Sequence, residues 1–206
     1  MSSVSAVIED AVAAIRAGKA VVLPTDTVYG LVADGYREAP ARALYALKGR
    51  PETMPAALLA ADLEMILDAV PELRGRAAVA ARALLPGAYT LVLPNPSQRF
   101  RWLCGERPET IGIRVPDLPP EARAVLDRVG AVASTSANLH GRPDACRVED
   151  VPPELRDRVG AIVDAGALPG PPSTVLDLTG PEPLVLREGA VPAAEALDRA
   201  RAAMAI

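Results

Sequence analysis

Two cations stand one residue apart in the segment Lys48-Gly49-Arg50-Pro51, just past a stretch with helical character. A lysine ammonium is a point charge and an arginine guanidinium is a planar fork of donors, so the pair can meet one anion from two sides. The alternative is that both charges only complement the C-terminal dipole of the preceding helix. Of the 22 basic residues only Lys19 and Lys48 are lysines, and this scarcity favours a functional role for Lys48.

A turn that carries two hydroxyls and a carboxylate directly follows a short apolar run at 20–23. The turn contains Thr25, Asp26 and Thr27. Because open α/β sheets place their ligand sites at strand ends, these groups could bind a small polar ligand. An Asx-type turn that satisfies its own backbone explains them equally well, and both interpretations stay open at this point.

A second polar turn follows the small-residue run 131–133, and its side chains belong to Ser134, Thr135, Ser136 and Asn138. Four hydroxyl or amide groups at the end of a strand could bind phosphate oxygens without a Walker loop. The alternative is a turn capped by its own side chains.

An arginine lies near the end of the run Ile111–Val115, which reads as a strand. Alternation of side chains along a strand predicts Ile111 and Ile113 on one face and Arg114 on the other. A guanidinium at a strand end suits a carboxylate or a phosphate. Near the C-terminus the polar set is completed by Ser173, Thr174 and Arg187.

Several kinds of chemistry are excluded by their missing motifs. The sequence has no GxxxxGK[ST] phosphate loop, no GxGxxG turn and no HExxH. His140 is the only histidine, so we predict no metal site built from protein side chains. Ser134, Ser136, His140 and Asp144 could suggest a hydrolase triad, but no nucleophile elbow surrounds either serine, and a surface-loop position for His140 is favoured.

The elements that must position these groups alternate between helices and strands. Helical spacing and end signals predict helices at 7–15, 39–47, 76–85, 119–129 and 193–205, and one more that begins after Asp62. Short apolar runs predict strands at 20–23, 56–60, 89–93, 111–115, 131–134, 161–164, 175–178 and 184–186. Some neighbouring strands have no helix between them, which favours a mixed α/β sheet.

Length and composition fit one domain that spans residues 1–206. The chain has 206 residues, of which 50% are hydrophobic and 23% charged, and this supports a sizeable core and excludes whole-chain disorder. The net charge of −4 argues against a surface coated with positive charge but permits a local basic cleft. No signal peptide or membrane-spanning run is visible, and the two cysteines lie far apart, so we expect a cytoplasmic protein.

Taken together, the segments PTDTVYGL, LKGRP, TIGIRVP, STSAN, PSTVLDL and LREGAV occur in the order found in the YrdC-like domain family. The sequence resembles this family, the L-threonylcarbamoyladenylate synthases, from about residue 20 to 190. The resemblance implies an open, twisted, mixed α/β sheet with flanking helices around a positively charged cavity. It also implies that L-threonine, bicarbonate and ATP are joined into threonylcarbamoyl-AMP with release of pyrophosphate, for N6-threonylcarbamoyladenosine in tRNA.

The resemblance also implies roles for individual residues. The paired basic motif and the Ser-x-Asn motif of the family fall on catalytic positions Lys48, Arg50, Ser136 and Asn138. Threonine would be held by Thr25 or Thr27, Arg114, Ser134 and Ser173, and ATP would be contacted by Arg50, Thr110, Ser136 and Arg187. Mg²⁺ is expected on the ATP phosphates. Expected partners are tRNA or double-stranded RNA and the proteins of the threonylcarbamoyl transfer complex, but no membrane.

Three positions depart from the family pattern. Met54 and Leu59 replace polar residues that commonly approach the ligands, and Asp144 stands where a small hydroxyl residue is common. The altered segment after Pro51, which contains Met54 and Leu59, leaves a second interpretation, a catalytically altered YrdC-like module for nucleic-acid binding or assembly. A third is a related carbamoyl-adenylate enzyme, as in hydrogenase maturation, but the additional domains of those longer chains are missing.

Overall fold

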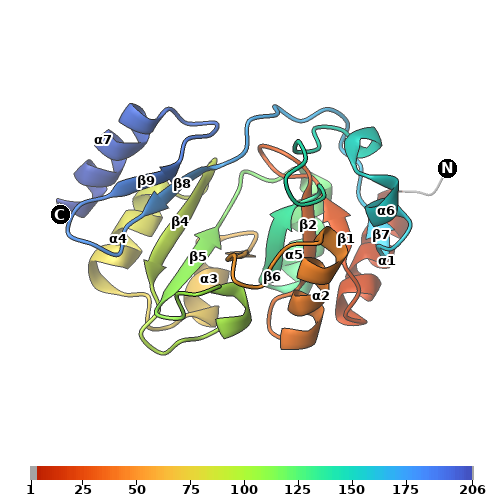
Figure 1. Cartoon of the computed structure of the whole chain (residues 1–206), viewed down its shortest axis with the longest axis horizontal. Helices are drawn as coiled ribbons and strands as arrows, with labels where there is room; N and C mark the ends of the chain where they lie inside the picture. Colours follow the sequence, from red (N-terminus) through yellow and green to blue (C-terminus); the bar gives the residue numbers. More distant parts are fainter. Residues whose placement is uncertain (1–3, 206) are drawn as a thin grey trace.

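The computed structural model describes residues 4–205, and its centre is a nine-stranded mixed sheet (Figure 1). The strands are β1 (Val21–Leu23), β2 (Gly30–Asp34), β3 (Ala57–Leu59), β4 (Tyr89–Pro94), β5 (Thr110–Arg114), β6 (Val132–Ser136), β7 (Ala161–Ile162), β8 (Thr174–Asp177) and β9 (Leu184–Arg187). Their order in the sheet is β7-β1-β2-β6-β3-β5-β4-β8-β9. The pairs β1–β7, β3–β5 and β4–β8 are parallel and the others antiparallel, so the predicted mixed α/β class is confirmed.

The helices agree closely with the helical spacing of the sequence. They are α1 (Val4–Arg16), α2 (Glu38–Lys48), α3 (Leu63–Ala69), α4 (Gly75–Leu84), α5 (Pro120–Val129), α6 (Pro153–Arg156) and α7 (Ala193–Met204), with 3₁₀ turns at Arg101–Leu103 and Val148–Asp150. The Asp62 carboxylate caps α3 as predicted, since it accepts a bond from the Met65 amide at 2.9 Å. The four-residue α6 was not predicted, because one turn carries no periodicity.

Strand β2 is the one long element that the sequence patterns missed. Four of its five residues are buried, and it pairs with β1 on one side and β6 on the other. A strand covered on both faces lacks the polar–apolar alternation by which half-buried strands are found. A second correction concerns β6, which continues through Ser136, two residues past the predicted end at 134, so that Thr135 and Ser136 lie within the strand and not in a turn after it.

Two apolar clusters cover the sheet. One joins Leu44 and Tyr45 of α2 and the buried side of α4 to Leu31, Leu58 and Ile113. The other packs α1 and α5 against alternate residues of the first half of the sheet, Val21 and Leu23 of β1, Val32 of β2, Leu59 of β3 and Val132 of β6. Figure 1 shows α4 and α7 beside the strands at one end of the sheet and α1 at the other. Among the described residues, no helix has the length and apolar character needed to span a bilayer.

The end of α2 is fixed by a glycine. Gly49 adopts φ 63° and ψ 33°, the left-handed conformation that favours glycine, and its amide and the Arg50 amide close the helix on Ala46 and Tyr45 carbonyls. The chain therefore reverses direction between Lys48 and Arg50. The two cations leave the helix end toward different partners.

Candidate active site

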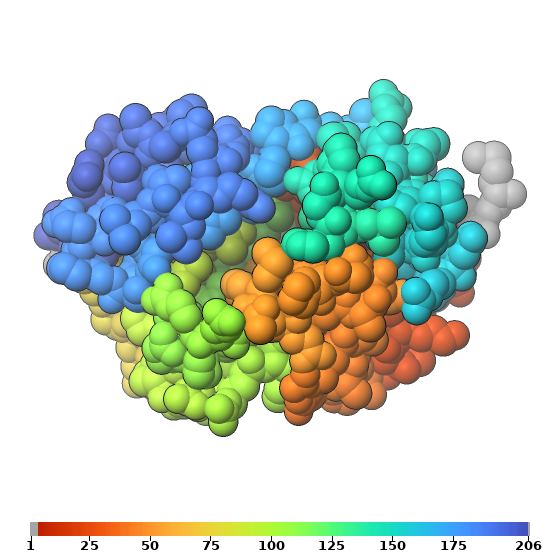
Figure 2. Space-filling view, in the orientation of Figure 1, coloured from red at the N-terminus to blue at the C-terminus, as the bar shows by residue number. Residues whose placement is uncertain are grey.

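A cavity of about 450 Å³ lies over the sheet, a size that suits a small-molecule ligand (Figure 2). Figure 2 shows the molecule hollowed between the blue C-terminal strands, the teal segment after β6 and the orange segment around residue 50. Its floor follows from strand register. Residues paired across neighbouring strands share one face of the sheet. On the cavity face these pairs are Val175–Arg187, Val92–Gly112, Gly112–Ala57 and Ala57–Ser134.

The same alternation separates the core from the site. Ile111 and Ile113 are buried in the apolar cluster with α2, whereas Arg114 lines the cavity on the opposite face, which confirms the prediction for this strand. The helices α1 and α5 cover this cavity face only at the Leu59 and Val132 end of the strands. Beyond that end, the same face of the sheet lines the cavity.

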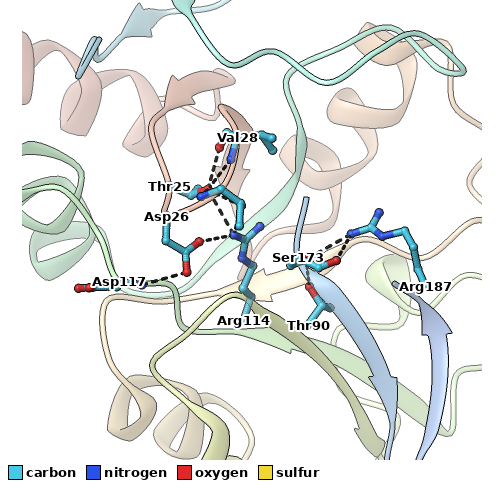
Figure 3. Close-up of polar contacts among 9 residues, drawn as sticks. Thr25, Asp26, Val28, Thr90, Arg114, Asp117, Ser173 and Arg187 are labelled. Carbon is cyan, nitrogen blue, oxygen red and sulfur yellow. Dashed lines mark hydrogen bonds and ion pairs between the residues drawn. The ribbon is translucent and has the colours of Figure 1, made fainter. Parts of the chain in front are cut away.

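Arg114 is anchored by the turn between β1 and β2 (Figure 3). Its Nη2 donates to Thr25 Oγ1 at 3.3 Å and to Thr27 Oγ1 at 2.5 Å, and forms an ion pair with Asp26 Oδ1 at 2.5 Å. Thr25 Oγ1 also donates to the Val28 carbonyl at 2.7 Å. Thr25 and Thr27 are buried and do not line the cavity, and their hydroxyls accept hydrogen bonds from Arg114.

A second anchored group faces this one across the cavity (Figure 3). Ser173 Oγ lies 2.8 Å from Thr90 Oγ1 and accepts a bond from Arg187 Nη2 at 3.3 Å, and the Ser173 carbonyl accepts from the same nitrogen at 2.7 Å. Thr90, Ser173 and Arg187 come from β4, the segment before β8, and β9. All three line the cavity.

The segment at Ser173 is fixed by close backbone packing. A Cβ at Gly189 would lie 2.1 Å from the Pro172 carbonyl oxygen and 2.7 Å from the Ser173 carbonyl carbon. The Gly189 amide donates to Thr174 Oγ1 at 3.0 Å. Only glycine permits this approach, since the obstructing atoms belong to the backbone.

Gly189→Ala is therefore expected to destabilise the fold. Displacing backbone atoms to make room for the methyl group costs about 2 kcal/mol, which lowers Tm by roughly 4–8 °C. Gly180→Ala is the matched control, because its Cβ would meet only the Glu182 carbonyl oxygen at 3.7 Å, an ordinary contact. Thermal unfolding of both variants measures the difference, and equal Tm values would contradict the packing argument.

Lys48, Ser136 and Asn138 form a closed network beside the cavity. Lys48 Nζ donates to the Ser136 carbonyl at 2.6 Å, to Ser136 Oγ at 3.1 Å and to Asn138 Oδ1 at 2.5 Å. Ser136 Oγ donates to Asn138 Oδ1 at 2.5 Å, and Asn138 Nδ2 donates to the Arg142 carbonyl. Of these groups only Ser136 lines the cavity, so Lys48 and Asn138 fix the end of β6 from behind.

Arg50 lines the cavity and is held by two contacts. Its Nη1 donates to Thr135 Oγ1 at 3.0 Å and its Nη2 to the Pro55 carbonyl at 2.7 Å, while Nε is buried without a hydrogen-bond partner among the described residues. The orphaned Nε and the fixed fork indicate a group oriented for a ligand.

The cations of the site interact electrostatically. The pKa of Lys48 is lowered to about 8, chiefly by burial and also by the neighbouring charge of Arg50, while the charge of Asp144 acts in the opposite direction. Burial also lowers the pKa of Arg50 and of Arg114, and Arg187 lowers both. The positive charge of Arg187 therefore repels those of Arg50 and Arg114 across the cavity, and a bound anion would relieve this repulsion.

The structure brings most of the predicted site residues together. Those that line the cavity are Arg50, Thr110, Arg114, Ser134, Ser136, Ser173 and Arg187. Thr25, Thr27, Lys48 and Asn138 hold the lining residues from behind. Thr90 also lines the cavity but was not predicted, because its only signal in the sequence is the alternation of the strand at 89–93.

The three departures from the family pattern fall in different places. Met54 is exposed, and Leu59 is buried against α1 and α5, so neither side chain lines the cavity. Asp144 does line it. His140 is exposed, and no hydrogen bond joins its ring to a serine or to Asp144 among residues 4–205, which gives no support to a hydrolase triad.

Within the described part of the chain, no three His, Cys, Asp or Glu side chains lie close enough to hold a metal ion. The carboxylates that line the cavity are Glu106 and Asp144. Both cysteines are free, and burial raises the pKa of Cys104 to about 11, so its thiol is protonated at neutral pH.

Comparison with known proteins agrees with this geometry. The family model of Sua5, YciO and YrdC proteins, described as "Telomere recombination", matches residues 13–189. A putative threonylcarbamoyl-AMP synthase of Mycobacterium tuberculosis is 39% identical over 89% of this chain and 84% of its own. The crystal structure of P. abyssi Sua5 complexed with L-threonine superposes with a TM-score of 0.84 and 32% identity over 93% of this chain and 56% of that one. E. coli YciO gives a TM-score of 0.81 and 28% identity over 96% and 95%. The chain belongs to the Sua5/YciO/YrdC family.

Proposed function

We propose that the protein is a threonylcarbamoyl-AMP synthase, which joins L-threonine, bicarbonate and ATP for the threonylcarbamoylation of tRNA. The observation that carries this proposal is the pair of anchored groups facing one cavity, Arg114 on one side and Ser173 with Arg187 on the other. The cavity lining carries four arginines and two carboxylates, a surplus of positive charge that suits anionic substrates.

The reaction needs charge neutralisation more than a nucleophilic side chain. The threonine amine and bicarbonate form a carbamate with loss of water, and a carbamate oxygen then attacks the α-phosphorus of ATP. The bond from the α-phosphorus to the bridging oxygen breaks, and pyrophosphate leaves. Since carbamate and ATP are both anions, the protein's task is to hold them together and stabilise the charge that develops on phosphorus.

The lining residues divide between the two substrates. Arg114, Ser134 and Ser173 would hold L-threonine, with Arg114 opposite its carboxylate, and Arg50, Thr110, Ser136 and Arg187 would contact ATP. Lys48 and Asn138 act as positioning residues through the end of β6. Mg²⁺ fits as a companion of the ATP phosphates, because it commonly binds through one or two carboxylates plus phosphate oxygens and Asp144 lines the cavity, and it would neutralise phosphate charge.

We propose further that residues 1–206 form one domain and that the protein works in the cytoplasm with tRNA and the proteins of the transfer step. The structure of residues 4–205 supports the first point through its continuous sheet. The cytoplasmic location and the partnership with tRNA and the transfer proteins stay predictions.

The test is pyrophosphate release by the purified protein. Release should require ATP, L-threonine and bicarbonate together. Release without threonine would indicate a carbamoyl-adenylate enzyme with another amine, and no release under any condition would favour a catalytically altered binding or assembly module.

Thr90→Val is expected to weaken the use of L-threonine selectively. Valine keeps the size and strand preference of threonine but removes the partner of the Ser173 hydroxyl. Loss of one such bond is worth about 1 kcal/mol, so the KM for L-threonine should rise roughly 5-fold while the KM for ATP is unchanged. Thr179→Val is the control, because Thr179 bonds to Asp177 and does not line the cavity. Equal rises in both KM values would refute a specific role for Thr90.

A further inference from the structure

The bonds of Arg114 are concentrated on one nitrogen. Its three partners, Thr25, Asp26 and Thr27, all meet Nη2. Among residues 4–205, Nη1 has no hydrogen bond and Nε is buried without a partner. Figure 3 shows the second terminal nitrogen directed away from the turn that holds Nη2. The guanidinium is thus held only through Nη2, and its Nη1 and Nε donors remain available to a ligand.

Asp26 is the charged residue among the three partners of Arg114 Nη2. Its Oδ1 lies 2.5 Å from Nη2, and both side chains are only about one-tenth exposed, at 10% for Arg114 and 11% for Asp26. The other carboxylate oxygen accepts a bond from the Asp117 amide at 3.3 Å, as Figure 3 shows. Asp26 lies between β1 and β2, and Asp117 follows β5. The Asp26 carboxylate is therefore also bound by the backbone of the segment that follows β5, the strand that carries Arg114.

The charge of Asp26 offsets the burial of the guanidinium. Burial lowers the pKa of Arg114, and Asp26 raises it by its charge and its hydrogen bond. When one member of a buried ion pair is removed, the other becomes an uncompensated charge and tends to leave its position. The two threonine hydroxyls are neutral and do not supply this compensation.

We propose that Asp26 is the positioning residue for amino-acid recognition, holding Arg114 at Nη2 so that its free donors meet the substrate carboxylate. This inference rests on the proposed function, because it assumes that the carboxylate belongs to L-threonine. Asp26 itself does not line the cavity and is not required to touch the substrate. Its effect should appear only in ligands that carry a carboxylate.

The test compares Asp26→Asn with Asp34→Asn by calorimetric binding. Asparagine keeps the size and an acceptor oxygen but removes the charge. Asp34 is the matched control, because it pairs with Arg37 at 2.6 Å on the neighbouring β2 but away from the cavity. Asp26→Asn should weaken L-threonine binding by about 10-fold or more, since a charged partner of a buried group is lost. Binding of ATP and of L-threoninol, which lacks the carboxylate, should change less than about 2-fold. Asp34→Asn should leave all three affinities unchanged.

A double-mutant cycle with Arg114→Ala separates positioning from general distortion. If Asp26 acts through Arg114, adding Asp26→Asn to Arg114→Ala should produce no further loss of L-threonine binding. Fully additive losses would overturn the proposal, and so would unchanged L-threonine affinity in Asp26→Asn. Should Asp26→Asn fail to fold, Asp26→Glu is measured by the same criteria, because it keeps the charge but displaces it by one methylene group.

Failure of the proposed function would be recognised separately. A wild-type protein that binds no L-threonine would refute that function, and crystal structures of the wild type and Asp26→Asn would then decide the role of Asp26 without a ligand. Displacement of the Arg114 side chain in the variant supports the positioning role. An unmoved side chain overturns it.

Discussion

Lys48→Ala is expected to abolish pyrophosphate release, with a loss of at least about 1,000-fold, while the fold stays intact. The variant removes the three bonds by which Lys48 Nζ holds Ser136 and Asn138, and it also removes a positive charge beside the reaction centre. Removal of one preorganised donor typically costs about 100- to 1,000-fold. Lys48→Ala is expected to cost more, because it releases the end of β6, where Ser136 lines the cavity, and removes a positive charge as well. Lys19→Ala is the matched control, since Lys19 is the other lysine of the chain and is exposed. Full activity of Lys48→Ala would remove the argument for this network.

The pH dependence of ATP binding gives an independent measurement of the same charge. Because burial lowers the pKa of Lys48 to about 8, the side chain loses its proton in the folded protein as the pH rises through that value. The Kd for ATP should therefore increase between pH 7.5 and about 9 in the wild type. In Lys48→Ala the same plot should be flat. A slope of equal size in both proteins would assign the pH dependence to another group.

Arg50→Lys is expected to reduce synthesis by about 100-fold or more, although the charge is kept. Arg50 uses Nη1 for Thr135 and Nη2 for Pro55, which orients its buried Nε and the plane of its fork. A lysine cannot make these contacts together, because its ammonium is a single point on a flexible stem. The expected change is a higher KM for ATP together with a lower kcat.

The control for Arg50 is Arg42→Lys on the same segment of chain. Arg42 is half-exposed and pairs with Glu38 and Glu52 at the surface. Surface ion pairs of this kind contribute little to folding stability. Its substitution should leave both kinetic constants unchanged. If Arg50→Lys retained full activity, charge alone would suffice at this position and the fork geometry would have no role.

Much of the fold could be predicted from local patterns. The helical spacing of α1, α5 and α7, the Asp62 cap and the alternation in β5 are short-range features, and each was found in the structure. Strand β2 could not be found in this way, because its burial on both faces removes the alternating pattern. For β6, hydroxyl residues suggested that the strand ends at 134, but pairing with β2 keeps Thr135 and Ser136 in the strand.

What the sequence determined by itself was the family, through six motifs in a fixed order, and with it the chemical types of the site residues. Tertiary structure decided which of them face the cavity and which hold others in place. Lys48 meets Asn138 across 90 positions of sequence, and Arg114 meets Thr25 across 89. A threonine hydroxyl or a lysine ammonium has the same identity whether its partner is a ligand or another side chain. That partner is set by long-range packing. Alternation could place Arg114 opposite the core, but no local pattern could separate Ser173, which lines the cavity, from Thr25 and Lys48, which lie behind it.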